Sequence, residues 1–239
     1  MPLPKISTPT YELNLPSTGK KVQYRPFLVR EEKLLVLALE TENPKDITTA
    51  MKTVIKNCLQ TRGIKVEALP TFDIEYLFLN IRGKSVGEEI EVNVICPDDE
   101  VTTVPITLNV DEIKVQKDKQ HTNKIKIDDS LVMEMKYPSL DQFIKNNFDF
   151  SEENQMDQSF ELISSCIDKI YNEEEVWSTA DVTKKEVIDF LEQMNSKQFK
   201  QIEKFFETMP KLSHDIKVKN PNTGVESTVV LEGLASFFG

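Results

Sequence analysis

The sequence predicts an α+β protein of two related halves, in which helices pack with short antiparallel β-hairpins. Residues 72–81 and 199–209 both place apolar side chains at positions i, i+3, i+4 and i+7, and each segment leads into an alternating stretch that ends at a proline turn. A helical period followed by a period of two indicates a helix that feeds a β-ribbon. The repetition predicts a duplicated packing module. The two stripes are Ile74, Leu77, Phe78 and Ile81, and then Ile202, Phe205, Phe206 and Met209.

Composition favours a folded globular protein. The chain has 239 residues, of which 39% are hydrophobic and 29% are charged, and this balance is not typical of disorder. The length is enough for one large or two small domains. A net charge of −11 argues against nucleic acid or an anionic membrane as the main partner. The apolar runs are far shorter than the roughly 20 residues that span a bilayer.

The cysteines predict a reducing compartment. Cys58, Cys96 and Cys166 are an odd number and widely spaced, so they do not form a disulfide framework. The first residues lack the apolar core of a signal peptide. Both observations lead us to expect a cytoplasmic protein.

We expect four segments along the chain. Residues 1–30 form an N-terminal β-hairpin arm, and residues 31–113 form a helix-plus-ribbon half. Residues 114–138 form a lysine-rich linker and a β-hairpin. Residues 139–239 form a helical half that ends in a C-terminal β-hairpin around a turn rich in Asn, Pro and Gly.

Several helices follow from the apolar periodicity. Residues 31–41 are apolar nearly all round, which predicts a buried helix. Residues 46–62 carry one apolar stripe and end at a glycine. In the second half, we expect helices over 139–146, 153–171 and 184–194, the last of them capped by a threonine.

Two turns have the shape of zinc knuckles but lack the ligands. Cys96-Pro97-Asp98-Asp99 contains one thiolate, and Asn220 and Thr223 stand where the second copy would need cysteines. A structural zinc site takes four ligands, usually paired as C-x2-C. We therefore expect metal-free turns and no cofactor.

No residue pattern points to catalysis. His214 lacks a Ser or Cys partner at a suitable spacing, and residues 173–175 are a solvated acidic stretch. The acidic turn at 98–100 lacks the spacing of a calcium loop. The five lysines of 114–126 are interpreted as a solvated linker rather than as a phosphate-binding segment, because no aromatic residues lie between them. We expect a protein that is not an enzyme and has no catalytic residue.

Candidate partner-binding residues lie near both ends of the chain. An isolated two-stranded hairpin is marginal in water, so the arm needs a sheet, a helix or a partner to hold it. It either binds a partner through Tyr24, Arg25, Pro26 and Phe27 or packs on its own domain. Phe237 and Phe238 would be costly to expose. They either pack into the core, which is slightly favoured, or meet a partner.

The chain resembles a viral family in several segments. The matching segments are 24–33 (YRPFLVREEK), 69–79 (LPTFDIEYLFL), 81–88 (IRGKSVGE), 205–212 (FFETMPKL) and 231–238 (LEGLASFF). These resemble the baseplate hub proteins of T-even-type contractile-tailed bacteriophages, in which a hub subunit and a hub assembly factor are related. The resemblance covers nearly the whole chain. Its more specific part is the tyrosine-leucine helix followed by the lysine-serine-valine-glycine turn.

The resemblance implies a role in building the tail baseplate. The expected function is that of a hub component or an assembly chaperone that binds other phage tail or baseplate hub proteins, without enzymatic activity. It implies a location in the host cytoplasm during assembly, and leaves open retention in the virion tail baseplate and self-association into a homo-oligomer.

Two rival functions remain beside it. A non-viral regulator that binds nucleic acid is the alternative, but it should show a basic helix face, and none is visible in the sequence. A hydrolase built on acidic residues would need two carboxylates facing one pocket.

Overall fold

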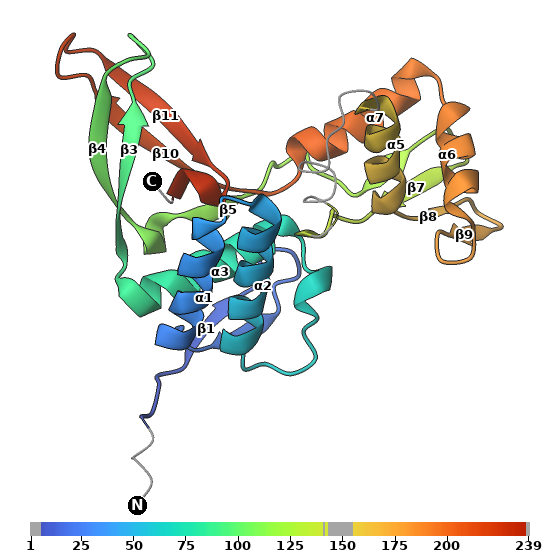
Figure 1. The fold of residues 1–239 in the computed structure, drawn as a ribbon. Helices are drawn as coiled ribbons and strands as arrows, with labels where there is room; N and C mark the ends of the chain where they lie inside the picture. Colours follow the sequence, from blue (N-terminus) through green and yellow to red (C-terminus); the bar gives the residue numbers. More distant parts are fainter. Residues whose placement is uncertain (1–5, 141, 143–154, 238–239) are drawn as a thin grey trace, which may run out of the picture. The chain divides into compact units, whose positions relative to one another are not determined.

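The computed structural model describes residues 6–140, 142 and 155–237, which form two compact units. Unit 1 contains the chain up to Val66, Phe72–Gln116 and the chain from Lys211 onward, whereas unit 2 contains Glu67–Thr71 and Lys117–Pro210. Helices and small antiparallel sheets occur in both units (Figure 1). The predicted α+β class is therefore confirmed.

Unit 1 begins with the predicted hairpin. Strands β1 (Tyr11–Asn14) and β2 (Lys21–Tyr24) pair antiparallel and are followed by helices α1 (Val29–Glu40) and α2 (Pro44–Cys58). The N–H of Arg25 donates to the carbonyl of Cys58 at 3.0 Å, and the N–H of Gln60 donates to the carbonyl of Gln23 at 2.8 Å. These bonds attach the hairpin to the end of α2. The hairpin thus packs on its own unit, which is one of the two alternatives that the sequence left open.

A buried ion pair joins this hairpin to α1. Arg25 Nη2 lies 3.0 Å from Oε1 of Glu31, whose side chain is completely buried. Glu31 Oε2 also accepts from the N–H of Leu28 at 2.8 Å, at the start of the helix. Burial alone would raise the pKa of Glu31, but hydrogen bonds from Arg25, Leu28 and Arg30 outweigh it and lower the pKa to about 2. The carboxylate therefore stays ionised.

The central helix of unit 1 is α3 (Thr71–Val86), which corresponds to the first predicted stripe. Its buried Asp73 accepts hydrogen bonds from the N–H, at 2.9 Å, and from the hydroxyl of Ser17, in the turn of the N-terminal hairpin. Gly83 lets the helix approach Val110 closely, because a Cβ at this position would lie 3.1 Å from a Val110 methyl. The fully buried apolar side chains of α3 are Ile74, Leu77, Leu79 and Ile81.

Two long ribbons complete unit 1. Strand β3 (Glu89–Ile95) pairs with β4 (Thr103–Asn109), and β10 (Lys211–Lys219) pairs with β11 (Glu226–Glu232). Strand β10 also pairs with β5 (Lys114–Gln116), which follows the short helix η2 (Val110–Glu112). The closing helix η4 (Leu234–Phe237) contacts β3 and β11, and this contact ties the two ribbons together.

These pairings correct the predicted division of the chain. The C-terminal hairpin belongs to unit 1 rather than to the helical half at 139–239, because β10 completes a sheet with β5. The two helix-and-ribbon copies exist as elements, but both ribbons lie in unit 1 while the second helix lies in unit 2. Amphipathic periodicity determines the type of an element, whereas long-range strand pairing decides its unit.

Unit 2 consists of helices on a four-stranded antiparallel sheet. The sheet has the order β6 (Lys124–Lys126), β7 (Val132–Met135), β8 (Ile167–Tyr171) and β9 (Val176–Ser178). Helices α5 (Gln155–Cys166), α6 (Lys184–Glu192) and α7 (Ser196–Thr208) pack with it. Their shared core contains Met133, Ile163, Ile167, Leu191, Ile202 and Phe205. A short helix η1 (Val66–Ala68) precedes α3.

One helix expected in this unit is shorter than predicted, and another lies largely outside the described residues. The helix expected over 153–171 ends at Cys166, and the last five residues form β8 instead. Ile167 and Ile170 are β-branched, which favours a strand, and both pair with residues of β7. Ile170 also pairs with Trp177 of β9. The helix expected over 139–146 lies largely outside the described residues.

Replacing Glu31 with glutamine should destabilise unit 1, because Arg25 would be left buried without a counter-charge. The expected loss is about 3 kcal/mol in the free energy of unfolding, measured by chemical denaturation followed by circular dichroism. The folded pKa of about 2 lies below the unfolded value of about 4.3. The stabilisation by Glu31 is therefore complete above the unfolded pKa and is lost as the pH falls through the folded pKa.

The matched control is Arg30→Gln, which removes a Glu31 partner whose side chain is 71% exposed. It should cost less than about 1 kcal/mol. Equal losses in the two variants would contradict the role assigned to the buried pair.

Candidate interaction surfaces

The partner-binding residues predicted near the N-terminus lie inside unit 1. Tyr24, Arg25 and Pro26 are buried, and Phe27 is half-buried, with its N–H donating to Ser85 Oγ at 2.9 Å. The structure gives these residues an internal role. Their use as a partner-binding surface therefore remains a prediction that the fold does not favour.

Near the C-terminus, the structure describes one of the two predicted phenylalanines. Phe237 is 1% exposed, so it takes the core role that the sequence slightly favoured. Phe238 lies outside the described residues.

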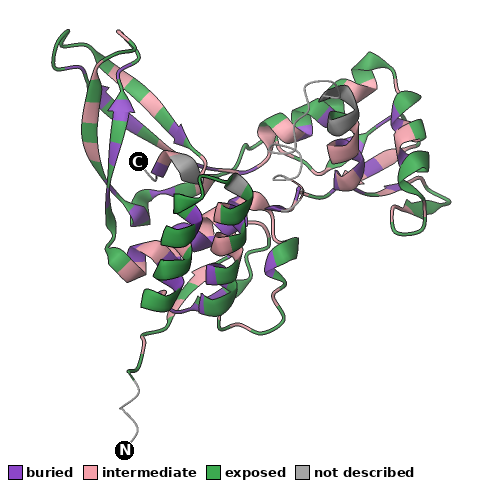
Figure 2. Cartoon of the chain, in the orientation of Figure 1, coloured by how far each residue is buried: buried purple, intermediate pink, exposed green. Residues whose placement is uncertain are grey.

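Helix α1 exposes an apolar surface to solvent. The expectation that this helix is buried is wrong, because its buried residues are Glu31 and Ala38 alone among the twelve described for it (Figure 2). Val29 is 79% exposed and Leu39 is 60% exposed. Exposed apolar patches on a protein surface often mark sites of protein–protein interaction. We call this surface the α1 face; it consists of Val29, Leu34, Val36, Leu37 and Leu39.

The tips of the two ribbons in unit 1 are joined by side-chain hydrogen bonds. The buried amide of Asn220 donates to both carboxylate oxygens of Asp98 at 3.0 Å and to Oδ2 of Asp99 at 2.9 Å. The hydroxyl of Thr223 donates to Asp98, and the amide of Asn222 donates to Thr102. Figure 1 shows the two ribbons running side by side toward these turns.

The two turns share one backbone shape, as the sequence indicated. The carbonyls of Cys96 and Asn220 accept from the N–H groups of Glu100 and Gly224, at 2.9 and 2.8 Å. Both donor residues have a positive φ, 57° and 76°. The structure thus pairs two knuckle-shaped turns through direct hydrogen bonds between their side chains.

The protonation states at the tips fit this arrangement. Hydrogen bonds from Thr223 and Asn220 lower the pKa of Asp98, and hydrogen bonds from Thr102 lower the pKa of Asp99. Burial raises the pKa of the Cys96 thiol, so it stays protonated. A thiolate rather than a thiol is the form that binds metal. Among the residues that the structure describes, no three His, Cys, Asp or Glu side chains converge on a metal position.

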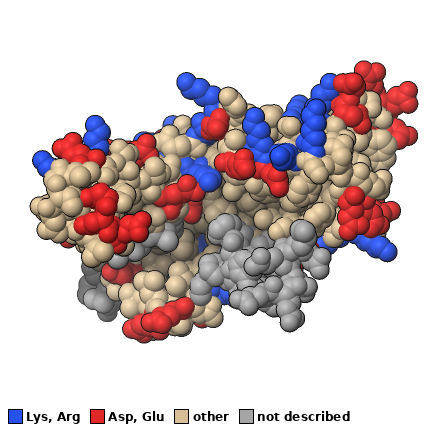
Figure 3. All heavy atoms as spheres, turned by 90° about the horizontal axis from the view of Figure 1, so that it is seen from above, with Lys and Arg blue, Asp and Glu red and all other residues tan. Residues whose placement is uncertain are grey.

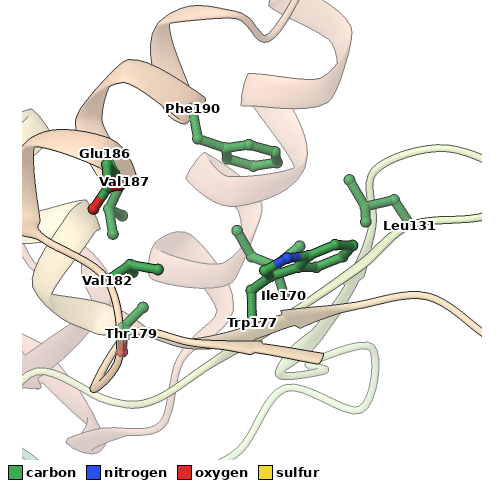
Figure 4. A pocket seen from close by; sticks show the side chains of 8 residues that line it. All are labelled: Leu131, Ile170, Trp177, Thr179, Val182, Glu186, Val187 and Phe190. Carbon is green, nitrogen blue, oxygen red and sulfur yellow. The ribbon is translucent and has the colours of Figure 1, made fainter. Parts of the chain in front are cut away.

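Unit 2 contains an apolar pocket of about 320 Å³. Figure 4 shows Trp177 and Ile170 on the sheet side and Phe190 on α6, all directed at the same space. Trp177, in the edge strand β9, is 40% exposed. The pocket is lined by Leu131, Ile170, Trp177, Thr179, Val182, Glu186, Val187 and Phe190.

A second hollow of unit 2 contains lysine and hydroxyl groups, and its hydroxyl groups and Lys184 have internal partners. The hydroxyls of Ser164, Ser165 and Thr179 donate to backbone carbonyls. Lys184 lies 2.7 Å from Glu161. These partners favour a structural role over an anion site.

His121, which the sequence did not single out, connects the beginning and the end of the long segment of unit 2. His121 Nδ1 lies 2.9 Å from the hydroxyl of Thr208, and Nε2 lies 3.0 Å from the hydroxyl of Tyr137. Its ring stacks on Tyr137 and packs against Phe205. Burial lowers the pKa of His121. These contacts give His121 a structural role. The sequence could not show that role, because Thr208 and Tyr137 are far from His121 along the chain.

Charged side chains of both signs share the surface. Figure 3 shows Lys and Arg side chains interspersed with Asp and Glu over one face of the molecule. A continuous basic patch for nucleic acid is not visible among the described residues of that face.

None of the helices in the described part of the chain is long and apolar enough to cross a membrane.

Replacing Asn220 with alanine should loosen the ribbon tips. It removes the donor shared by Asp98 and Asp99, and we expect a loss of about 1 to 3 kcal/mol in the free energy of unfolding. Because the folded pKa values of both carboxyl groups are lowered, this stabilisation is present above their unfolded pKa of about 3.9 and is lost as the pH falls through the folded values. Denaturation at neutral and at acidic pH measures both effects.

Asn222→Ala is the matched control, since it removes one amide from the same turn and leaves the two carboxylates paired. An Asn220→Ala variant no less stable than this control would reject the proposed network.

We further predict that the protein binds no zinc, because the two turns offer one protonated thiol and are already joined by hydrogen bonds. Elemental analysis of protein purified without chelators checks this, with a known zinc protein as the positive control. Stoichiometric zinc would overturn it.

Comparison with protein families matches residues 8–239 to the family described as T4 bacteriophage base plate protein. No curated protein and no solved structure matches the chain. The family match agrees with the resemblance seen in the sequence and covers both units. The chain therefore belongs to the T4 bacteriophage base plate protein family and is a baseplate protein of T4-type phages.

Proposed function

We propose that this baseplate protein is a component or assembly factor of the baseplate hub and acts by binding other tail proteins. The observation that carries the proposal is the α1 face. Five apolar side chains are exposed on one helix. The start of this helix is held by the buried Arg25–Glu31 ion pair and by the hydrogen bond from Leu28 to Glu31. Covering this face with a partner would remove apolar surface from water, at roughly 25 cal/mol per Å².

A binding role also agrees with the polar clusters. In the described residues, the carboxylates at the ribbon tips accept hydrogen bonds from amide and hydroxyl donors, and both ring nitrogens of His121 are hydrogen-bonded to hydroxyl groups. Such groups hold the fold together and are not arranged as an acid, a base and a nucleophile around one cavity. We propose that the protein is not an enzyme. We also propose that it acts in the host cytoplasm during tail assembly.

The test is capture of tail proteins from phage-infected cells with the tagged chain, together with mass spectrometry of purified virions. A Val36→Glu, Leu39→Glu variant should lower capture of its baseplate partner at least tenfold, because it places charge in the α1 face. Val230→Glu is the matched control, since Val230 is an apolar residue of unit 1 that is 56% exposed on β11.

The outcomes separate the alternatives. Capture together with presence in the virion identifies a hub component, and capture with absence from the virion identifies an assembly factor. If the wild-type chain captures no tail protein, the proposal is wrong. If both variants bind like the wild type, binding does not use the α1 face.

A further inference from the structure

The pocket of unit 2 is open, apolar and built around the only tryptophan of the chain. Trp177 lies opposite Ile170 in the β8–β9 pair, so both side chains enter the pocket from the same face of the sheet. Helix α6 closes the other side with Val187 and Phe190 (Figure 4). Partly exposed tryptophans in apolar surroundings are typical anchor points of protein interfaces.

The size of the pocket limits what can fill it. A volume of about 320 Å³ is at the lower end of the range for small-molecule sites. It fits an apolar side chain or two, rather than a whole helix. The occupant we consider is therefore an anchoring side chain that projects from a longer segment.

The surroundings of the pocket carry negative charge. Val132 pairs with Tyr171 between β7 and β8, so the β6–β7 turn and the β8–β9 turn lie at the same end of the sheet. Between them, these turns carry Asp128, Asp129, Glu173, Glu174 and Glu175, all of them exposed. We call these five residues the acidic rim.

The acidic rim is held next to the pocket by hydrogen bonds. Asp128 Oδ1 accepts from the N–H of the pocket residue Leu131 at 2.8 Å. The side chain of Asn172 accepts from the N–H groups of Glu174 and Glu175, at 2.9 and 2.6 Å, and Glu175 is two residues from Trp177. Asp129 pairs with Lys126 at 3.0 Å. A charged rim beside an apolar centre is the usual arrangement of a specific interface.

We propose that this pocket receives an apolar side chain from a segment of another tail protein, and that lysine or arginine residues flank that side chain and face the acidic rim. The partner is identified by this chemistry: an apolar anchor with basic neighbours. The proposal rests on the proposed function only in that the segment belongs to a tail protein. It uses unit 2, whereas the α1 face belongs to unit 1.

The first experiment identifies the occupant in infected cells. Trp177 is replaced by the photo-crosslinking residue p-benzoylphenylalanine in the full chain, and the crosslinked peptide is sequenced by mass spectrometry. We expect a tail-protein peptide with an apolar residue at the crosslink and Lys or Arg next to it. The same crosslinker at Val230 of unit 1 is the control and should not yield that peptide.

The second experiment tests the charge with a defined probe. The fluorescence of Trp177 reports directly on the pocket, because no other tryptophan is present. Titration with a synthetic Lys-Lys-Leu-Lys-Lys peptide should change the emission, and the matching Glu-Glu-Leu-Glu-Glu peptide should not.

Matched charge variants show whether the acidic rim attracts the peptide. Glu174→Lys, Glu175→Lys should weaken its binding about tenfold. Glu203→Lys, Glu207→Lys, two exposed residues of α7 in the same unit, change the net charge equally and should leave binding unaltered.

Several results would overturn the inference. These are a crosslink to a second copy of this chain, a crosslinked peptide without basic residues, equal binding of both synthetic peptides, or no crosslink at all. Failure here does not disprove the proposed function, because capture through the α1 face is measured separately. If capture itself fails while the Lys-Lys-Leu-Lys-Lys peptide still binds, the pocket is real and its assignment to a tail protein is wrong.

Discussion

The architecture depends on a short stretch of antiparallel pairing between β5 and β10. Lys114, Val115 and Gln116 face Ser213, Leu212 and Lys211, so the chain leaves unit 1 and returns to it at adjacent positions. The segment between them can then fold as a unit of its own. Its ends are held together internally by the bonds from His121 to Thr208 and Tyr137. The β5–β10 pairing also joins the C-terminal ribbon to unit 1, together with η4 and the hydrogen bonds at the ribbon tips.

Polar contacts, rather than additional apolar contacts, fix the exposed parts of unit 1. The Arg25–Glu31 pair fixes the start of α1, and Asp73 fixes the turn of the N-terminal hairpin. The hydrogen bonds around Asn220 fix the ribbon tips. Directional bonds of this kind specify one geometry at small net gain in stability. Helix α1 can therefore keep its position while much of its apolar surface faces water.

Local sequence signals predicted the elements well. Thr183 caps α6 as expected, and the turn beginning at Asn220 joins two strands. The knuckle shape of both turns was also visible, because Cys96-Pro97 and Asn220-Pro221 stand at matching places in the two copies. The segments that resemble the phage family all lie within residues 8–239, which the family match covers.

The predictions that failed are ones that depend on distant contacts. Apolar residues in α1 indicated burial, but apolarity does not reveal whether a neighbouring element covers the helix. The stretch after Cys166 was expected to be helical, yet its pairing with β7 and β9 made it a strand. The apolar pocket combines residues from a turn, two strands and a helix, and no spacing in the sequence brings them together. Two weak binding surfaces on separate units can together give strong binding to one partner. Once the first contact has formed, the second forms within the same complex and at a high effective concentration. The α1 face and the pocket belong to different units of one chain, so a single partner that engaged both proposed surfaces would gain from this effect without one large interface.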